Sequence, residues 1–304
     1  MRPDRDFTIF KCGDILLLLN ELVERGMKLG LIMNLKSIID CHSHSNYSAD
    51  SQMLAHDGVR SALGAGIGGL AFTDHLDIDY PNREYNYTFD FDHRSKFLDE
   101  LRNEFSGKAK ILKGLELGFQ PHIIDQAAQI VQMNDFDFVI GSVHAVDGYT
   151  LSENAGYYQG KNKQQAYLRY LEEVYNSVVG MDCFDVIGHI GYIRRYAPDE
   201  DRSLQFIDYR DVLDMILKKV VDKGKGIEVN TSGYHYKGLG TPIPNFDIIE
   251  RYKELGGEML TIGSDSHQAR YVGNSFMPVL QRLKSIGFNY VTYFEERKPV
   301  FVKI

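Results

Sequence analysis

The alternation of short apolar runs with helical segments restricts the fold of this chain more than any other feature. Seven runs rich in β-branched and other apolar residues are typical of buried strands, and segments with helical periodicity separate most of them. The runs cover residues 37–41, 69–74, 111–116, 136–142, 184–189, 226–232 and 259–265. The clearest helical segments cover residues 92–105, 121–132, 163–180 and 208–223. Repeated strand-then-helix order predicts an α/β fold with parallel strands and right-handed crossovers.

Polar residues at the ends of these runs separate two α/β architectures. An open doubly wound sheet would spread them along an edge, whereas a barrel brings all strand C-termini to one face. Nearly every run ends in residues that can bind metal, as in DCHSH at 40–44 and GSDSH at 263–267. We therefore favour a barrel of seven strands with its site at the C-terminal face.

The spacing of the histidines indicates a metal centre. On an extended segment, residues i and i+2 point to the same side, so His42 and His44 can bind one ion, and Asp265 with His267 repeats this spacing. One histidine at a strand end is more often structural than a ligand. Six of the ten histidines, however, share these positions with three carboxylates: His42, His44, His75, His144, His189 and His267 with Asp50, Glu116 and Asp265. Nine such ligands without thiolate predict two or three divalent ions, Zn, Mn or Fe.

Composition excludes several other classes of protein. The chain has 34 Lys and Arg against 42 Asp and Glu, a net charge of -8, so we expect neither nucleic acid nor an anionic membrane as a partner. Its three cysteines have no C-x-x-C spacing, which argues against a disulfide framework and favours a cytoplasmic location. The apolar run that begins at Ile15 is short and flanked by charges, so it predicts no transmembrane span.

We expect two parts, an N-terminal helical extension at 1–35 and one catalytic domain at 36–304. The extension is either an amphipathic helix or the result of a wrongly assigned translation start, because Met33 shortly precedes the first strand. The sequence does not indicate the oligomeric state. Two long Tyr-rich connections, 80–91 and 145–163, follow predicted ligands and are typical of lids or binding loops.

Taken together, these motifs resemble the PHP (polymerase and histidinol phosphatase) superfamily, and within it the histidinol-phosphatases. The matching pieces occur in the family's order from about residue 36 to 304. They are DCHSHSNYSAD at 40–50, FTDH at 72–75, GLELGF at 114–119, GSVH at 141–144, GHIGYIRRY at 188–196, EVNTSGY at 228–234 and GSDSH at 263–267.

This resemblance implies a distorted (β/α)7 barrel with a trinuclear metal site. One ion would be held by His42, His44, Glu116 and Asp265, a second by Glu116, His144 and His189, and a third by Asp50, His75 and His267. Glu116 would bridge the first two ions.

The resemblance also implies a phosphate-binding arginine, which matches Arg194, with Arg195 as the neighbouring candidate. The chain departs from the family at Gly191, where Asp is frequent, and after NTSG, where arginine is frequent. There, His235 or Lys237 can supply positive charge, although lysine does not reproduce a bidentate fork.

The resemblance further implies hydrolysis of a phosphomonoester, L-histidinol phosphate, in histidine biosynthesis. We expect a metal-bridging hydroxide to attack phosphorus in line. Glu116 and His189 would bind the ions, and Arg194 would stabilise the negative charge on the equatorial oxygens. The loop after His75 can supply an acidic and aromatic pocket for the alcohol, or it can simply cover the barrel; its candidates are Asp77, Asp79, Tyr85, Tyr87 and Phe89. Alternatives are another PHP phosphoesterase acting on nucleotides, oligonucleotides or phosphotyrosine, and a catalytically silent PHP binding module.

Overall fold

The computed structural model describes residues 34–304 apart from 86, 153–154 and 237. Backbone contacts divide the chain into Met1–Asn34 and Leu35–Ile304, and only the second unit is described below. The predicted helical extension at 1–35 thus lies almost entirely outside the described residues, and so does Lys237.

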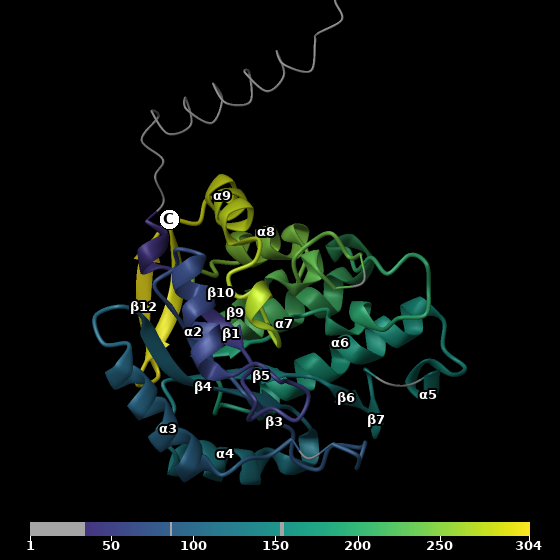
Figure 1. Cartoon of the computed structure of the whole chain (residues 1–304). Helices are drawn as coiled ribbons and strands as arrows, with labels where there is room; N and C mark the ends of the chain where they lie inside the picture. Colours follow the sequence, from purple (N-terminus) through teal and green to yellow (C-terminus); the bar gives the residue numbers. More distant parts are fainter. Residues whose placement is uncertain (1–33, 86, 153–154, 237) are drawn as a thin grey trace, which may run out of the picture. The chain divides into compact units, whose positions relative to one another are not determined.

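Seven parallel strands form the barrel, in the order β1-β2-β4-β5-β8-β9-β10 (Figure 1). They are β1 (Ile39–Ser43), β2 (Gly69–Phe72), β4 (Lys110–Gly118), β5 (Phe138–Ser142), β8 (Val186–Ile187), β9 (Gly226–Asn230) and β10 (Leu260–Gly263). Backbone bonds join β10 back to β1, because the N–H of Asp265 donates to the carbonyl of His42 and the N–H of His44 donates to that of Ser266. All seven predicted strands are confirmed, and so is the barrel that we favoured over an open sheet.

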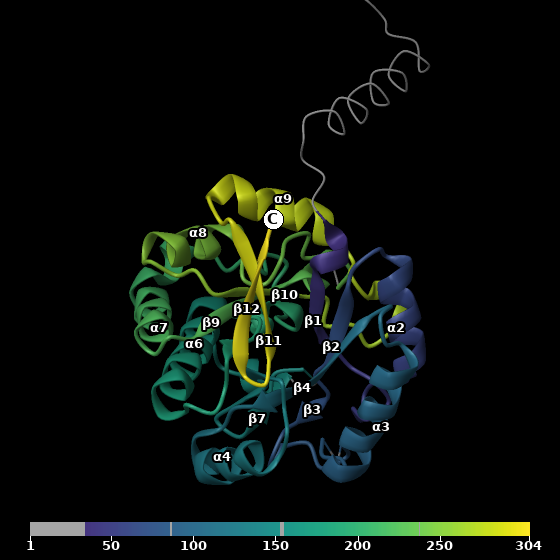
Figure 2. The ribbon, with the colours of Figure 1, turned by 90° about the vertical axis from the view of Figure 1, so that its left-hand side faces the viewer.

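Helices surround the barrel as a ring, as Figure 2 shows. They are α2 (Ala55–Gly64), α3 (Phe91–Glu104), α4 (Ile124–Met133), α6 (Lys163–Gly180), α7 (Arg210–Asp222), α8 (Phe246–Glu254) and α9 (Phe276–Ile286), with a short α5 (Ala155–Tyr158). The four predicted helices correspond to α3, α4, α6 and α7. Within the described residues, no helix is both long enough and apolar enough to cross a membrane.

Short elements at the strand C-termini carry much of the site. They are β3 (His75–Leu76), β6 (Ala145–Val146) and β7 (Tyr149–Thr150), and the 3-10 helices η2 (Pro121–Ile123), η3 (Tyr192–Arg195), η5 (Thr231–Tyr234) and η6 (Ala269–Tyr271). Two further 3-10 turns, η1 (Leu35–Ser37) and η4 (Phe206–Tyr209), precede β1 and α7.

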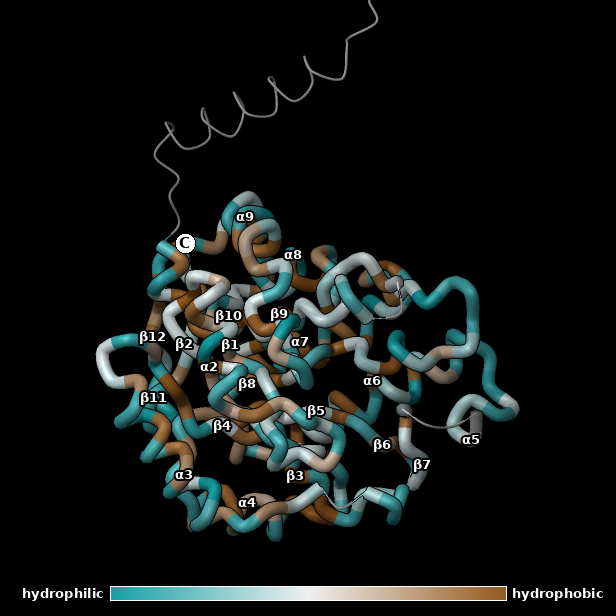
Figure 3. The backbone as a smooth tube through the Cα atoms, viewed as in Figure 1, coloured by the Kyte–Doolittle hydropathy of each residue, from teal (hydrophilic) through white to brown (hydrophobic). Residues whose placement is uncertain are grey.

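An antiparallel hairpin, β11 (Tyr290–Glu295) and β12 (Lys298–Lys303), crosses the opposite end of the barrel (Figure 2). Phe294 joins the buried core that Ile39, Cys41 and Phe138 form inside the barrel. Figure 3 shows hydrophobic segments running through this centre. The hairpin therefore closes the N-terminal end, and the interior is packed rather than open. We did not predict this hairpin from the sequence.

Candidate metal centre

The first two ligand candidates come from β1, whose register shifts between Asp40 and Ser43. Such a bulge re-aims side chains next to an active site. Cys41 therefore packs in the core below, whereas His42 and His44 lie fully buried at the mouth. Their Nε2 atoms are 3.1 Å apart, within hydrogen-bond distance of each other.

Glu116, near the end of β4, is the centre of the cluster. Its Oε2 lies 3.1 Å from His42 Nε2, 3.3 Å from His44 Nε2 and 3.1 Å from His75 Nδ1. Its Oε1 lies 3.1 Å from His144 Nε2. The same oxygen is 2.8 Å from the Nε2 of His189, which follows β8. One carboxylate thus faces five imidazoles, as a bridging ligand does.

Asp265 and Asp50 complete the set of nine. Asp265 Oδ1 lies 3.5 Å from His42 Nε2 and 3.3 Å from His44 Nε2. Asp265 has a φ of 53°, a left-handed conformation that Asp tolerates better than most residues. Asp50 Oδ2 lies 3.3 Å from His267 Nε2 and 3.6 Å from His75 Nε2. The structure therefore brings all nine predicted residues together, and their division among individual ions stays a prediction.

The donor set fits divalent ions. Four groups each place one ligand atom per residue within 4.8 Å of the others, and they overlap through His44, His75, Glu116 and His144. Glu116 Oε2, His75 Nδ1 and His189 Nδ1 are buried without a hydrogen-bond partner in the described part of the chain. Buried polar atoms normally have such partners. Atoms that converge closely yet form no hydrogen bond are the arrangement that metal ions satisfy.

Charge keeps the central carboxylates ionised. Burial by itself would raise the pKa of Glu116, but the imidazoles of His42, His75 and His144 outweigh it and hold this pKa well below its usual range. For Asp265, Arg195 and His42 likewise overcome burial and lower the pKa. Both residues therefore present the anionic form that binds metal.

Two further carboxylates that we did not predict as part of the centre orient the ligands. Glu228, in β9, lies 2.6 Å from His42 Nδ1, and its Oε2 accepts the backbone N–H of His189 at 2.8 Å. Asp77 lies 2.9 Å from His144 Nδ1. Carboxylates in this position fix the ring orientation and tautomer of a metal-binding histidine. The signal for Glu228 was present in the sequence, because it is a lone charge inside an apolar strand.

A buried network behind His44 was also missed. Ser48 Oγ lies 3.0 Å from His44 Nδ1 and donates to Asp74 at 3.2 Å. Asp74 in turn accepts from Arg94 Nε at 2.7 Å, and the guanidinium also donates to the carbonyls of Phe72 and Gly114. Arg94, on helix α3, thereby helps to fix the orientation of His44, which follows β1.

The two neighbouring arginines point in different directions. Arg194 donates to Asn245 Oδ1 at 2.6 Å and to Thr241 Oγ1 at 3.0 Å, and it does not line the cavity above the metal ligands. Arg195 does line that cavity and pairs with Asp265. Its guanidinium lies over the ring of Tyr192, at 4.9 Å. The placement therefore favours Arg195 over Arg194 at the site.

The cavity above the ligands has a volume of about 270 Å³. Besides metal ligands and Arg195, its lining includes Tyr192, Tyr196, Ser232, His235, Tyr236, Gln268 and Tyr271. His235, a predicted substrate contact, stacks on Tyr271 with ring centres 4.0 Å apart. Burial lowers the pKa of His235, so its imidazole is neutral near pH 7.

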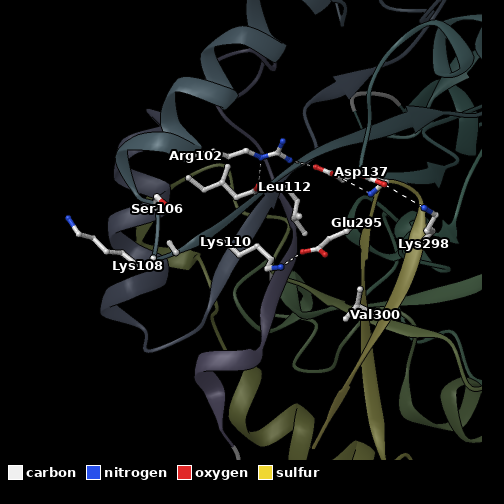
Figure 4. A pocket seen from close by; sticks show the side chains of 13 residues that line it. Arg102, Ser106, Lys108, Lys110, Leu112, Asp137, Glu295, Lys298 and Val300 are labelled. Atoms are coloured by element: carbon white, nitrogen blue, oxygen red, sulfur yellow. Dashed lines mark hydrogen bonds and ion pairs between the residues drawn. The ribbon is translucent and has the colours of Figure 1, made fainter.

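A larger cavity, of about 830 Å³, lies at the opposite end of the barrel, between the start of β4 and the hairpin (Figure 4). Most of its charged side chains are paired with one another. Arg102 contacts Asp137, Lys110 contacts Glu295, and Lys298 contacts Glu296. This groove therefore consists largely of ion pairs, and it holds no group of metal ligands among the described residues.

Comparisons with known proteins agree with this geometry. The family model described as PHP domain matches residues 40–232. This chain belongs to the PHP domain family. The histidinol-phosphatase of Lactococcus lactis is 30% identical over 260 residues, which are 86% of this chain and 95% of that protein. A probable histidinol-phosphatase of Clostridium acetobutylicum is 31% identical, over 86% of this chain and 98% of its own.

A solved structure matches this PHP domain closely. It is the histidinol phosphate phosphatase from Lactococcus lactis complexed with zinc, L-histidinol and phosphate, and it is similar with a TM-score of 0.82 and 30% identity. The match covers 87% of this chain and 99% of the other. The fold and the family predicted from the sequence are thus confirmed, and the described residues include the predicted kind of His, Asp and Glu groups that can hold several metal ions.

Proposed function

We propose that this PHP domain is a metal-dependent phosphatase that hydrolyses L-histidinol phosphate to L-histidinol and phosphate. The observation that carries the proposal is the convergence of five imidazoles on Glu116 beside a buried arginine. The Lactococcus lactis relative, which is similar over nearly its whole length, carries zinc, L-histidinol and phosphate. This reaction would place the enzyme in histidine biosynthesis.

Zinc or another divalent ion would be held by the nine residues named above. Such ions polarise phosphoryl oxygens and lower the pKa of water, which makes a nucleophile at neutral pH. Glu116 and Asp265, held ionised, supply the negative charge that a cationic cluster needs. Glu228 and Asp77 fix the rings of His42 and His144, so the ligand geometry is preset before the substrate arrives.

Arg195, rather than Arg194, is our candidate for the phosphate contact. It lines the cavity, and its buried Nε has no hydrogen-bond partner among the described residues. Its Nη2 donates to Ser232 Oγ at 2.5 Å and to Asn230 Oδ1 at 3.4 Å. A guanidinium held in this way binds phosphoryl oxygens in a fixed geometry. His235, neutral and on the same cavity wall, is a second candidate donor.

The test is phosphate release by zinc- or manganese-loaded protein from L-histidinol phosphate, AMP, a phosphotyrosine peptide and short single-stranded DNA. We expect a strong preference for L-histidinol phosphate. Preference for AMP, the peptide or the DNA would keep the metal chemistry but assign the chain to another PHP phosphoesterase. No turnover of any substrate by metal-loaded protein would favour the silent binding module.

A pair of histidine variants controls this assay. His42→Ala should abolish turnover and lower the metal content together. His56→Ala is the matched control, because His56 is a half-exposed histidine on α2 that contacts Glu104, Phe97 and Phe105, none of which is a metal-ligand candidate. Near-normal turnover in His42→Ala would contradict the assignment of the centre.

A further inference from the structure

The chain makes a tight turn between two residues of the site, the metal-ligand candidate His189 and the cavity residue Arg195. The N–H of Tyr192 donates to the carbonyl of His189 at 2.8 Å, which closes the turn. Gly191 is the third residue of this turn, with a φ of 114° and a ψ of 16°. A type II turn needs a positive φ at its third residue, and glycine supplies it without steric cost. The turn therefore sets the direction in which η3 leaves β8.

A tyrosine on a surrounding helix bonds to the middle of this turn. The buried N–H of Gly191 donates to the hydroxyl of Tyr170, on α6, at 3.2 Å. The same hydroxyl lies 3.5 Å from the carbonyl oxygen of His189. Tyr170 is 1% exposed and is not among the residues that line the cavity of Arg195. Its hydroxyl therefore acts on the turn from behind the site.

The metal-ligand side of the turn has anchors of its own. The N–H of His189 donates to Glu228 at 2.8 Å, and its Nε2 lies 2.8 Å from Glu116 Oε1. These contacts do not involve the peptide of Gly191. Loss of the bond to Tyr170 should therefore leave His189 in place.

The arginine side depends on the turn more directly. Gly191 precedes Tyr192, and the guanidinium of Arg195 lies over the Tyr192 ring at 4.9 Å. A buried N–H that loses its acceptor costs free energy, which rotation of its peptide can relieve. Such a rotation would move the Tyr192 ring together with the guanidinium that lies over it.

Other contacts hold the rest of η3. Arg194 donates to Asn245 Oδ1 at 2.6 Å, and the hydroxyl of Tyr158 donates to the carbonyl of Ile193 at 3.2 Å. Both act after the peptide of Gly191, so they keep η3 folded without fixing the turn before it. A change at the turn should therefore shift Arg195 rather than unfold the segment.

We propose that Tyr170 is a positioning residue for the phosphate contact, because its hydroxyl fixes the peptide that orients Tyr192 and, through it, Arg195. This inference rests on the proposed function, in which Arg195 contacts the phosphate. Tyr170 acts through other residues and from outside the cavity. It should therefore influence the affinity for phosphate more than the chemical step or the metal content.

Tyr170→Phe is the direct test, since it removes the hydroxyl and keeps the ring. In the zinc-loaded protein, calorimetry should show about tenfold weaker binding of inorganic phosphate, as an unsatisfied buried donor predicts. The KM for L-histidinol phosphate should rise to a similar extent, while kcat stays within about threefold of wild type. Zinc content should equal that of wild type, because His189 keeps its own anchors.

Tyr252→Phe is the matched control. Tyr252 is also 1% exposed, and its hydroxyl donates to the backbone carbonyl of Met259 at 2.9 Å, just before β10 begins. This variant should lose similar stability in urea, while phosphate binding and KM stay within about twofold. Equal weakening of phosphate binding in both variants would overturn the inference. So would unchanged phosphate affinity in Tyr170→Phe, or a parallel loss of zinc, which would place the effect on His189.

Gly191→Ala tests the same turn without touching Tyr170. A Cβ at Gly191 would come no closer than 3.5 Å to its neighbours, so the substitution strains only the backbone. It should weaken phosphate binding at least as much, again with normal zinc, and unchanged binding would contradict the role of the turn.

The phosphate titration needs no turnover, so it separates this inference from the proposed function. A wild-type chain that binds phosphate but does not hydrolyse L-histidinol phosphate would refute the proposed function and leave the test of Tyr170 intact. A metal-loaded wild-type chain that bound no phosphate would overturn both.

Discussion

The two ends of the barrel both carry many charged groups, but they combine them in opposite ways. At the C-terminal end, imidazoles crowd together around a few carboxylates: the ring of His44 stacks on His267 at 4.1 Å and on His75 at 4.3 Å. At the N-terminal end, bases lie beside acids, as where Lys113 Nζ contacts Asp135 at 2.6 Å. Crowding of imidazoles is unfavourable unless a ligand joins them, whereas pairing of opposite charges stabilises the fold directly.

This difference shows that a functional site is identified by buried polar groups without hydrogen-bond partners rather than by the volume of its cavity. The groove in Figure 4 is about 830 Å³ and the metal cavity about 270 Å³, yet only the smaller one leaves buried donors and acceptors without partners. We therefore expect substitutions at the C-terminal end to affect catalysis and metal binding, and substitutions at the N-terminal end to affect only stability.

The largest effect is expected at Glu116. Glu116→Gln should lower phosphate release by at least ~1,000-fold, because it removes the carboxylate that faces five imidazoles and belongs to two of the four metal-ligand groups. Metal content, measured by mass spectrometry, should fall in parallel. The control is Glu104→Gln, whose carboxylate is 54% exposed and contacts His56. Full metal content with activity within about tenfold of wild type would refute the bridging role.

A smaller loss is expected at Glu228, which contacts ligands without touching the cavity. Glu228→Gln should weaken metal binding by roughly 10–100-fold, as loss of an orienting carboxylate does. Activity should return when the metal concentration is raised, which separates positioning from catalysis. Glu258→Gln, at a carboxylate that is 79% exposed, should leave the metal titration unchanged. An activity loss that metal cannot rescue would argue against a positioning role.

At the other end, Asp137→Ala should destabilise the fold by about 3 kcal/mol, because a buried partner of Arg102 is lost. Asp137 also accepts the backbone N–H groups of Lys113 and Glu296, which ties β4 to the hairpin. Urea unfolding measures the loss, and kcat of the folded protein should stay within about twofold. Asp135→Ala, where the side chain is 71% exposed, is the control and should cost less than about 1 kcal/mol.

The smallest effect is expected for Lys110→Ala, since its pair with Glu295 is half-exposed on both sides. Such pairs contribute about 0–1 kcal/mol. Steady-state kinetics should not change either. A clear shift in KM or in metal content would contradict the expectation that this end affects only stability, because it would show that a substitution in the groove alters the metal centre.

Much of the site could be predicted because its metal-ligand candidates occur at short, regular spacings in the sequence. H-x-H and D-x-H at strand ends place imidazoles and carboxylates on one side, and barrel closure then brings distant strand ends together. The orienting partners were harder to predict. Glu228 meets His42 only through the pairing of nonadjacent segments, and Asp74 reaches His44 through Ser48.

Other features could not be predicted for physical reasons. Arg194 and Arg195 are consecutive in the 3-10 helix η3, where one residue turns the side chain by about a third of a circle. Sequence order therefore cannot tell which guanidinium faces the cavity. The hairpin, by contrast, was predictable from two β-rich runs, YVTYF at 290–294 and PVFV at 299–302, on either side of the charged turn EERK at 295–298, a signal that we did not use.

Three tyrosines that line a cavity of about 220 Å³ beside the metal ligands, Tyr80, Tyr85 and Tyr87, belong to one loop that supplies none of the nine metal-ligand candidates. The loop that can contact the alcohol is thus encoded apart from the segments that supply the metal ligands. After a gene duplication, changes confined to this loop can give a copy a new preference while it inherits the reaction intact. Divergence of substrate range does not then require rebuilding the centre.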